Sequence, residues 1–184
     1  MTSFETDRLI ARRFKSDDWR DFQEYVSQKD VTKYDSEYPS TDEDCKRIVE
    51  YFSKGIGFWA ICLKETGKLI GHIVCNQKEP KEFLTWHIGF VFNPAFYGKG
   101  YATEACERVI QYAFEELGAH RVESACHPDN TPAWKLLERL SMRREAHHKK
   151  NVFLRKTSDG KPIWWDSYVY AILEEEWKIR NAKP

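Results

Sequence analysis

Alternating hydrophobic and polar residues mark about seven segments of this chain, and a period of two predicts β-strands with one buried face. Two of the segments flank the turn-forming residues 64–67, which indicates an antiparallel hairpin. Two others flank Ser158, Asp159 and Gly160 and predict a second hairpin near the C-terminus. The predicted strands span 9–14, 57–63, 68–76, 83–92, 121–127, 143–155 and 163–173.

Apolar residues spaced three and four positions apart predict helices between these strands. Ser16 and the two aspartates after it cap the first helix, and Thr41 begins a capping box before the second. Gly118 ends the third helix, and Pro132 suits the first turn of the fourth. The expected buried faces consist of Trp19, Phe22 and Val26; Cys45, Ile48, Val49 and Phe52; Ala102, Ala105, Cys106, Val109, Ile110, Ala113 and Leu117; and Ala133, Leu136, Leu137 and Leu140.

The order of these elements predicts the fold class. A helix lies between strands 83–92 and 121–127, so a crossover joins this pair and we expect it to be parallel, while the hairpin-linked strands are antiparallel. The expected fold is therefore α/β (α+β), with a mixed central sheet of about seven strands and flanking helices. A chain of 184 residues can bury a substantial core, and we expect residues 1–184 to form a single domain.

A glycine turn connects one of the two parallel strands to the third helix. Gly98, Lys99 and Gly100 stand directly before that helix, where glycine lets a ligand approach the backbone and the first-turn amides point at an anion. The pattern predicts binding of a phosphorylated small molecule, with a plain tight turn as the alternative. A Walker A loop ends in Gly-Lys-Ser or Gly-Lys-Thr, but here Tyr101 follows Gly100 and no such triplet exists, so that loop is excluded. A dinucleotide fingerprint needs a third glycine, and Thr103 stands in its position.

Two longer motifs include this turn and the helix that begins near Pro132. The first reads Tyr97, Gly98, Lys99, Gly100, Tyr101, Ala102 after Phe92, Asn93, Pro94, and the second contains Asn130, Ala133, Leu136, Leu137, Glu138, Leu140, Ser141 and Met142. They resemble motifs A and B of the GCN5-related N-acetyltransferases (GNATs), although Tyr97 replaces the Gln or Arg of motif A and Phe92 replaces its Val. The blocks 6–9, 100–105 and 165–177 resemble the RimJ/RimL branch, which acetylates protein N-termini and assorted small amines.

The resemblance implies that acetyl-CoA is the acetyl donor. In the family the two parallel strands splay apart, the pantetheine arm pairs with the first of them, and the glycine turn holds the pyrophosphate. The implied cofactor-binding residues are Phe90, Val91, Phe92, Tyr97, Gly98, Lys99, Gly100, Tyr101, Ala102, Thr103 and Asn130. The implied acceptor is a primary amine, on a small molecule or a protein N-terminus, that attacks directly in a ternary complex. Relatives are often dimers, so a homodimer is left open.

Such a reaction needs a proton acceptor, because an amine with a pKa near 10 is only about one part in a thousand unprotonated at neutral pH. His87 has a suitable ordinary pKa, shares a strand face with Thr85 and Gly89, and stands where the RimL-like pattern has Glu. We predict that His87 is the catalytic base, with a structural histidine as the alternative. Asp166 matches a family acid near the acceptor pocket and is predicted to bind the substrate ammonium, or else to pair with a basic residue.

The general acid is open. Leu137 occupies the position of the family's usual Tyr. Cys126 and His127 are the remaining candidate proton donors, although a role in the strand core and in the loop fits them as well. Leu137 in place of the usual Tyr, and His87 in place of the usual Glu, are also compatible with a non-catalytic acyl-CoA-binding or sensing module. Turnover of acetyl-CoA with an amine would exclude that alternative. A nucleotide-binding regulatory domain is a further alternative and would need residues 101–103 to bind a ribose phosphate.

Composition narrows the possible partners. Lys and Arg total 29 and Asp and Glu total 29, so no net charge attracts nucleic acid or an anionic membrane. The five cysteines form no Cys-x-x-Cys pair and are expected to be reduced and mostly buried, and the six histidines show no metal-ligand spacing. We find no signal-peptide core or membrane-spanning run, and therefore expect a cytoplasmic protein without a metal.

Overall fold

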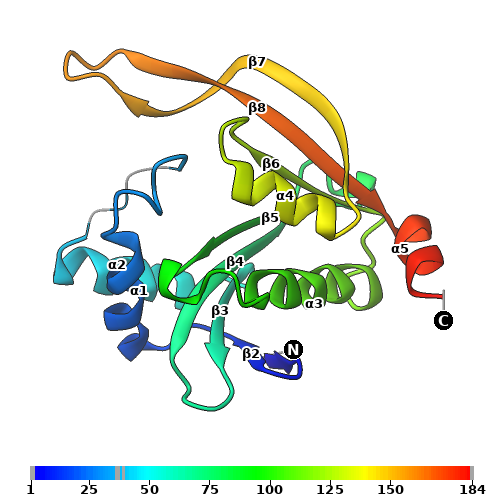
Figure 1. Ribbon diagram of the computed structural model, residues 1–184, viewed down its shortest axis with the longest axis horizontal. Coiled ribbons are helices and arrows are strands. Elements are labelled where there is room, and N and C mark those ends of the chain that lie inside the picture. The colour runs from blue at the N-terminus through cyan, green and yellow to red at the C-terminus, as the bar shows by residue number, and fades with distance from the viewer. Residues whose placement is uncertain (1–2, 36–37, 39, 183–184) are drawn as a thin grey trace. The chain divides into compact units, whose positions relative to one another are not determined.

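The computed structural model describes residues 3–35, 38 and 40–182. The strands are β1 (Ser3–Glu5), β2 (Leu9–Arg12), β3 (Phe58–Leu63), β4 (Leu69–Gln77), β5 (Thr85–Phe92), β6 (Arg121–Cys126), β7 (Arg143–Lys156) and β8 (Pro162–Leu173). The α-helices are α1 (Trp19–Val26), α2 (Asp42–Lys54), α3 (Tyr101–Glu115), α4 (Thr131–Arg139) and α5 (Glu174–Asn181) (Figure 1). Short 3-10 helices span Ser16–Asp18, Lys81–Phe83 and Pro94–Phe96.

The described strands form an eight-stranded sheet in the order β1-β2-β3-β4-β5-β6-β8-β7. β5 and β6 are parallel, and the neighbouring pairs β1/β2, β2/β3, β3/β4, β6/β8 and β7/β8 are antiparallel. The predicted mixed α/β fold is confirmed, including both hairpins. The sequence pattern missed β1, which is too short to show an alternation, and α5, in which Trp177 is the buried residue.

Contacts within the chain divide it into two compact units. Unit 1 comprises Met1–Cys75 and Phe90–Arg108, and unit 2 comprises Asn76–Gly89 and Val109–Pro184. Both β5 and α3 contribute residues to each unit. The single domain expected for residues 1–184 stays a prediction.

The core of unit 1 joins the apolar faces of α1 and α2 to β3 and β4. Ser16, Asp17 and Asp18, expected to cap the first helix, instead form the 3-10 helix before α1, and Asp18 makes no side-chain cap hydrogen bond to α1. The Asp18 carboxylate pairs with both terminal nitrogens of Arg12 at 2.7 and 2.8 Å and accepts a hydrogen bond from Lys15 N at 2.7 Å. Thr41 Oγ1 caps α2 by accepting from Asp44 N at 3.2 Å, as the capping box predicts. The buried cluster consists of Phe14, Phe22, Tyr25, Val26, Cys45, Val49, Phe52, Ala60, Cys62 and Leu69.

A polar pair lies inside this aromatic core. The Tyr25 hydroxyl and His72 Nδ1 are 2.8 Å apart, and both side chains are fully buried. The rings of Phe14, Phe22 and Phe52 lie against the imidazole. Burial lowers the pKa of His72 from 6.5 to about 3, so the folded protein holds a neutral imidazole at neutral pH.

In unit 2, the parallel register joins Thr85–His87 of β5 to Arg121–Glu123 of β6. Among the described residues this pairing stops at His87 and Glu123, although β6 continues along β8 as far as Cys126. The predicted parallel pair is therefore short, and its last residue on β5 is His87.

One face of the unit 2 sheet is covered by α4. Tyr170 of β8 donates a hydrogen bond to Glu138 of α4 at 3.1 Å, and Tyr170 pairs with Ser124 of β6. Glu123 and its β5 partner His87 therefore lie on the opposite face, because side chains alternate along a strand. The α4 residues expected in the core, namely Ala133, Leu136, Leu137 and Leu140, are all buried.

The buried His72 predicts a specific loss of stability in acid. The unfolded chain takes up a proton near pH 6.5 and the folded chain only near pH 3, so the free energy of unfolding should decrease as pH falls through this window. The slope from this residue approaches about 1.4 kcal/mol per pH unit. Urea unfolding of the parent and of His72→Gln between pH 4 and 7 measures it, with the exposed His120→Gln as control. Equal pH dependence in the parent and His72→Gln would contradict the expectation.

Candidate functional site

The glycine turn lies in unit 1, between the end of β5 and the start of α3. Gly98 has a φ of 74° and Gly100 a φ of 81°, a backbone conformation that favours glycine. α3 begins at Tyr101, directly after Gly100. The first amides of a helix have no partner within it, and they lie at the positive end of its dipole. The turn can therefore hold an anion of the size of a phosphate group.

The outer side of this turn is open in the described part of the chain. A Cβ built on Gly98 meets no atom within 4 Å, and one built on Gly100 meets Arg8 Nη2 at 3.4 Å. Lys99, between the two glycines, is exposed. A ligand can thus approach the backbone here without displacing other groups.

Asn93 anchors the entry to the turn. This buried side chain accepts a hydrogen bond from Ala95 N at 3.0 Å and donates one to Glu24 Oε1 of α1 at 2.8 Å, while Asn93 N donates to Ile70 O at 2.8 Å. The Tyr97 hydroxyl donates to Phe92 O at 3.0 Å, so it is tied to the strand that precedes the turn. The side chains of Asn93 and Tyr97 therefore stabilise the backbone conformation of the turn.

The three strand residues expected to pair with a cofactor also lie in unit 1. Phe92 is buried, and Phe90 and Val91 are half-buried. A Cβ on Gly71 would lie 2.5 Å from the Phe92 ring and 2.6 Å from Val91 O, so glycine is required for β5 to lie this close to β4. The Phe92 side chain thus packs in the core, while its backbone remains a separate group that could pair with a ligand.

A clasp formed by Thr6, Arg8 and Glu104 holds the first turn of α3. Glu104 Oε1 accepts hydrogen bonds from Thr6 Oγ1 at 2.5 Å and from Arg8 N at 3.0 Å. Its Oε2 pairs with the Arg8 guanidinium at 2.6 and 2.7 Å. Arg8 Nη1 also donates to Lys99 O at 2.9 Å, and the guanidinium lies 4.5 Å from the ring centre of Tyr101.

Sequence reasoning assigned no role to this clasp. The blocks 6–9 and 100–105 were recognised as family marks, but they are about a hundred residues apart and no periodicity links them. The signal in the sequence is that the carboxylate of Glu104 lies in the first turn of a helix predicted to bind phosphate, where it would repel an anion unless a cation neutralised it.

His87 lies in unit 2, at the last register position of β5. Burial lowers its pKa, the neighbouring Glu123 opposes that effect, and Lys78 adds to it. A Cβ built on Gly89, on the same strand face, meets His87 Nε2 at 3.8 Å within the described chain. The imidazole is therefore neutral at neutral pH and has space beside its Nε2, as a base requires.

Asn130 is the N-cap of α4. Its side-chain oxygen accepts a hydrogen bond from Ala133 N at 3.3 Å, which is the capping role that the residue type allows. The amide nitrogen of Asn130 is a separate group that can donate to a ligand. Capping and cofactor binding are therefore compatible at this position.

The residues considered for the general acid differ in their surroundings. Leu137 is fully buried and has no polar hydrogen to give. Burial raises the pKa of the Cys126 thiol to about 11, so this sulfur stays protonated at neutral pH. His127 Nδ1 accepts a hydrogen bond from Asp129 N at 3.1 Å, and its ring meets Trp165 edge-on. The loop role of His127 is thus the one observed.

Asp166 contacts basic groups of the neighbouring strand. Its Oδ2 lies 2.9 Å from both His147 Nε2 and Lys149 Nζ, and its Oδ1 accepts a hydrogen bond from Lys150 N at 3.0 Å. These contacts, Lys149 first, hold the pKa of the Asp166 carboxyl well below its usual range. In the structure Asp166 therefore pairs with basic residues, which is the alternative given above. An ammonium ligand would have to displace Lys149.

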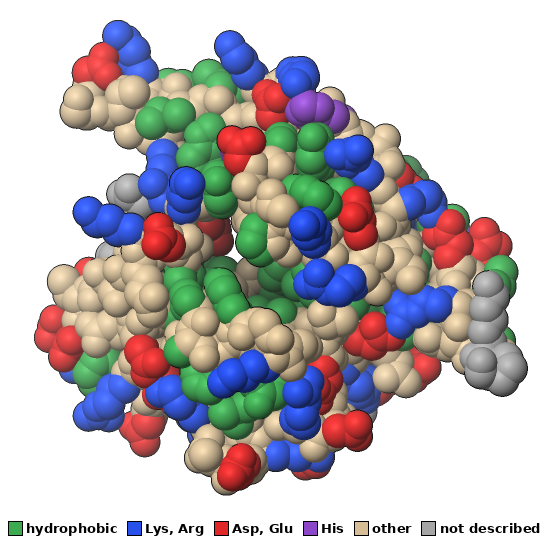
Figure 2. All heavy atoms as spheres, viewed as in Figure 1, with side chains coloured by type: hydrophobic (Ala, Val, Ile, Leu, Met, Phe, Trp, Pro, Cys, Tyr) green, Lys and Arg blue, Asp and Glu red, His purple; other side chains and the backbone are tan. Residues whose placement is uncertain are grey.

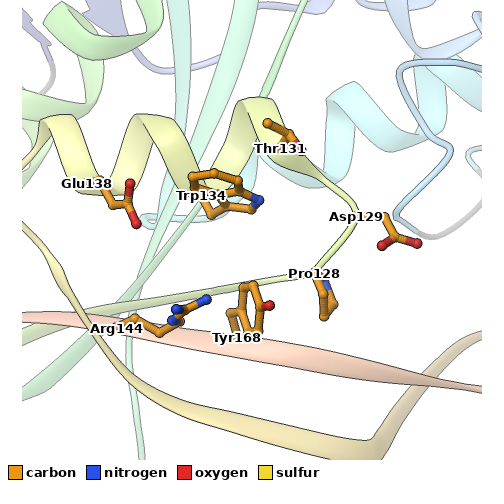
Figure 3. Close-up of a pocket in the computed structure, with 7 residues that line it drawn as sticks. All are labelled: Pro128, Asp129, Thr131, Trp134, Glu138, Arg144 and Tyr168. Atoms are coloured by element: carbon orange, nitrogen blue, oxygen red, sulfur yellow. The ribbon is translucent and has the colours of Figure 1, made fainter.

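A pocket of about 470 Å³ opens in unit 2 between α4 and the β7–β8 hairpin. Figure 3 shows Trp134 and Glu138 extending from α4 towards Arg144 and Tyr168 on the strands. The Arg144 guanidinium lies 4.4 Å from the ring centre of Tyr168. The pocket lies on the sheet face opposite His87, because Tyr168 pairs with Cys126 and His87 with Glu123. Pro128, Asp129 and Thr131 complete its lining.

Other expectations concern the chain as a whole. The five cysteines are free, and all except Cys126 are buried, as predicted. Within the described residues we find no group of three or more His, Cys, Asp or Glu side chains placed to bind a metal, and no helix long and apolar enough to span a membrane. Figure 2 shows acidic and basic side chains interspersed on the visible face, in line with the balanced composition.

The chain resembles known proteins over most of its length. Residues 8–143 match the Acetyltransferase (GNAT) domain family. The uncharacterized N-acetyltransferase YnaD of Bacillus subtilis is 40% identical over 174 residues, which cover 94% of this chain and 97% of that protein. The uncharacterized N-acetyltransferase p20 of Bacillus licheniformis is 30% identical over 183 residues, 96% of this chain and 99% of p20. A crystal structure of a GNAT-family acetyltransferase from Bacillus anthracis, 37% identical, has a TM-score of 0.85 and covers 95% of this chain and 100% of its own.

The strand, glycine turn and helix lie within a mixed sheet whose fold is that of the GNAT acetyltransferases. The chain belongs to the GNAT family and is an N-acetyltransferase. GNAT acetyltransferases use acetyl-CoA as cosubstrate.

The clasp predicts a selective effect on cosubstrate binding. Arg8→Ala removes the guanidinium contacts to Lys99 O and Glu104 but keeps the backbone hydrogen bond to Glu104. It should raise KM for acetyl-CoA about two- to tenfold with kcat retained, the effect of losing hydrogen bonds worth about 0.5 to 1.5 kcal/mol. Arg8→Lys keeps the charge but cannot donate to both partners, so it should fall between the parent and Arg8→Ala. Steady-state kinetics measures the effect, with Arg20→Ala on α1, which stacks on Trp19, as control. An unchanged KM in Arg8→Ala would refute the role of the clasp.

Proposed function

We propose that this N-acetyltransferase moves an acetyl group from acetyl-CoA to a primary amine, by direct attack within a ternary complex, and that it belongs to the RimJ/RimL-like branch. The acceptor class is a protein N-terminus, such as that of a ribosomal protein, or a small amine. The observation that carries the proposal is the glycine turn, with its two positive φ angles directly before the N-terminus of α3.

The cosubstrate contacts that we propose fall into three groups. The backbone of Phe90, Val91 and Phe92 would pair with the amides of the pantetheine arm, since a strand can bind an extended chain through its main-chain groups. Asn130 would donate its side-chain amide to the same arm. The pyrophosphate would be held by the turn and the first turn of α3, namely Tyr97, Gly98, Lys99, Gly100, Tyr101, Ala102 and Thr103.

His87 is the base that we propose. The amine nitrogen forms a bond to the thioester carbonyl carbon and gives its proton to the neutral imidazole, and the tetrahedral adduct then breaks its carbon–sulfur bond to release the thiolate. Three observations support this role: the lowered pKa of His87, the open space beside Nε2, and its place where the parallel pairing stops.

The leaving thiolate needs no protein acid in this scheme. A thiol has an ordinary pKa near 8.5, so the thiolate is a competent leaving group, and the buried Leu137 cannot protonate it. A covalent route through Cys126 is disfavoured, because a thiol with a pKa of about 11 is a poor nucleophile at neutral pH. Asp166 remains the proposed contact for the substrate ammonium, which would take the place of Lys149.

Release of free thiol from acetyl-CoA tests the proposal. Purified protein should release thiol only when an amine is supplied, and a panel of peptides with free N-termini, polyamines, amino-acid derivatives and aminoglycosides identifies the class. A burst of thiol without an amine would indicate an acetylated enzyme and contradict direct attack.

The glycine turn yields a sharp binding test. Gly100→Val should abolish binding of CoA, because a branched side chain is strained at a φ of 81° and fills the surface that the phosphates approach. Gly67→Val is the matched control: Gly67 also has a positive φ, of 73°, but lies in the β3–β4 turn. Calorimetry with CoA, and with ATP and NAD for comparison, reads out both variants. A folded Gly100→Val variant that binds CoA like the parent would show that the turn is not the phosphate site.

The role of His87 as the base is tested by replacing its imidazole with a side chain that does not titrate. His87→Gln should keep the fold and the affinity for CoA but lower kcat by about a hundredfold or more. In the parent, kcat/KM should fall as pH decreases through a pKa below the ordinary 6.5 of histidine, and this acidic limb should be absent from His87→Gln. Undiminished turnover of His87→Gln at saturating substrates would exclude His87 as the base and leave the acetyl-CoA assignment intact.

A further inference from the structure

A series of ion pairs crosses unit 2 on charged side chains of β6, β7 and α5. It begins with Lys78, just after β4, which contacts Glu123 of β6. Arg121 Nε lies 3.5 Å from the other oxygen of Glu123, and the Arg121 guanidinium continues the series to Glu145 of β7. Arg143 then pairs with Glu145 at 2.6 Å and with Glu176 of α5.

The start of this series lies beside His87. Glu123 is the register partner of His87, and paired residues in neighbouring strands point to the same face. Lys78 is held against this strand pair, because Lys78 N donates a hydrogen bond to Thr85 O at 2.8 Å. The charged groups that face His87 are thus Glu123 and Arg121 from β6 and Lys78 from the segment after β4.

Glu123 is not an ordinary surface carboxylate. Its side chain is only 15% exposed, and two cations contact its two oxygens. A half-buried carboxylate next to an imidazole would stabilise the protonated form of that imidazole and make it a poorer proton acceptor. Cations on the same carboxylate oppose this effect.

We propose that Lys78 and Glu123 are positioning residues for the transfer reaction: their ion pair, with Arg121, keeps His87 neutral and ready to accept the amine proton. The inference rests on the proposed role of His87 as base. The opposing contributions of Glu123, which raises the pKa of His87, and Lys78, which lowers it, agree with this arrangement. The pair thus sets the pH at which the enzyme begins to work.

Two single substitutions should move the acidic limb of the rate profile in opposite directions. Lys78→Met leaves Glu123 less compensated, so the apparent pKa of kcat/KM should rise by about 0.3 to 1 unit. Glu123→Gln leaves Lys78 without its carboxylate partner near the imidazole, while Arg121 keeps Glu145, so the apparent pKa should fall by a similar amount, about 0.3 to 1 unit. The double variant should lie between the two. Lys81→Met is the control, because Lys81 is an exposed lysine of the same unit that pairs with Glu79.

The imidazole itself provides a readout that is independent of turnover. NMR titration of His87 in the parent, the two single variants and the double variant should give the same ordering of pKa values, with Lys81→Met titrated as the control. Opposite shifts in both measurements, absent from Lys81→Met, support the proposal. A loss of activity or melting temperature without any shift would mean that the pair is only structural, and would overturn it.

The parent and His87→Gln separate this inference from the proposed function. If His87→Gln lacks the acidic limb but Lys78→Met and Glu123→Gln leave it where the parent has it, the base assignment stands and the inference fails. If the limb persists in His87→Gln, the base assignment fails, and the inference fails with it.

Discussion

The hydrogen bonds that hold the turn between β5 and α3 are the interactions on which the proposed cosubstrate site depends. Backbone amides can bind an anion only if the backbone is fixed in advance, since a mobile loop would lose that freedom on binding. Here Asn93 fixes the entry of the turn through Glu24 and Ile70, and Arg8 fixes its exit through Lys99. Each anchor comes from a part of unit 1 remote in sequence, so the turn is only as well formed as that unit's fold.

Charge compensation recurs at both candidate sites. Glu104 in the first turn of α3 would weaken anion binding, and Arg8 neutralises it through a charge-assisted pair at 2.6 Å. In unit 2, Lys78 and Arg121 do the same for Glu123 beside His87. In each case a carboxylate can serve as a structural acceptor because its charge is cancelled locally, within the few ångströms over which the functional group would otherwise respond to it.

Burial acts on histidine in two different ways in this protein. His72 lies wholly inside the aromatic core of unit 1, where its neutral form satisfies the Tyr25 hydroxyl and no solvent reaches it. His87 is half-buried, so desolvation lowers its pKa while the space beside Gly89 keeps it accessible. Only the second arrangement allows proton transfer, because a base must touch its substrate.

The sequence by itself determined the element order, the parallel pair, both hairpins and the glycine turn, because these follow from local periodicity and from backbone needs that Gly98 and Gly100 meet wherever they occur. It also led to the family through motifs A and B. Only the tertiary structure decided the partners of the site residues, namely Arg8 with Glu104, Asp166 with Lys149, and Glu123 with Lys78. Such ion pairs join residues that are distant in the sequence, and no sequence pattern around a charged residue predicts which partner it will contact.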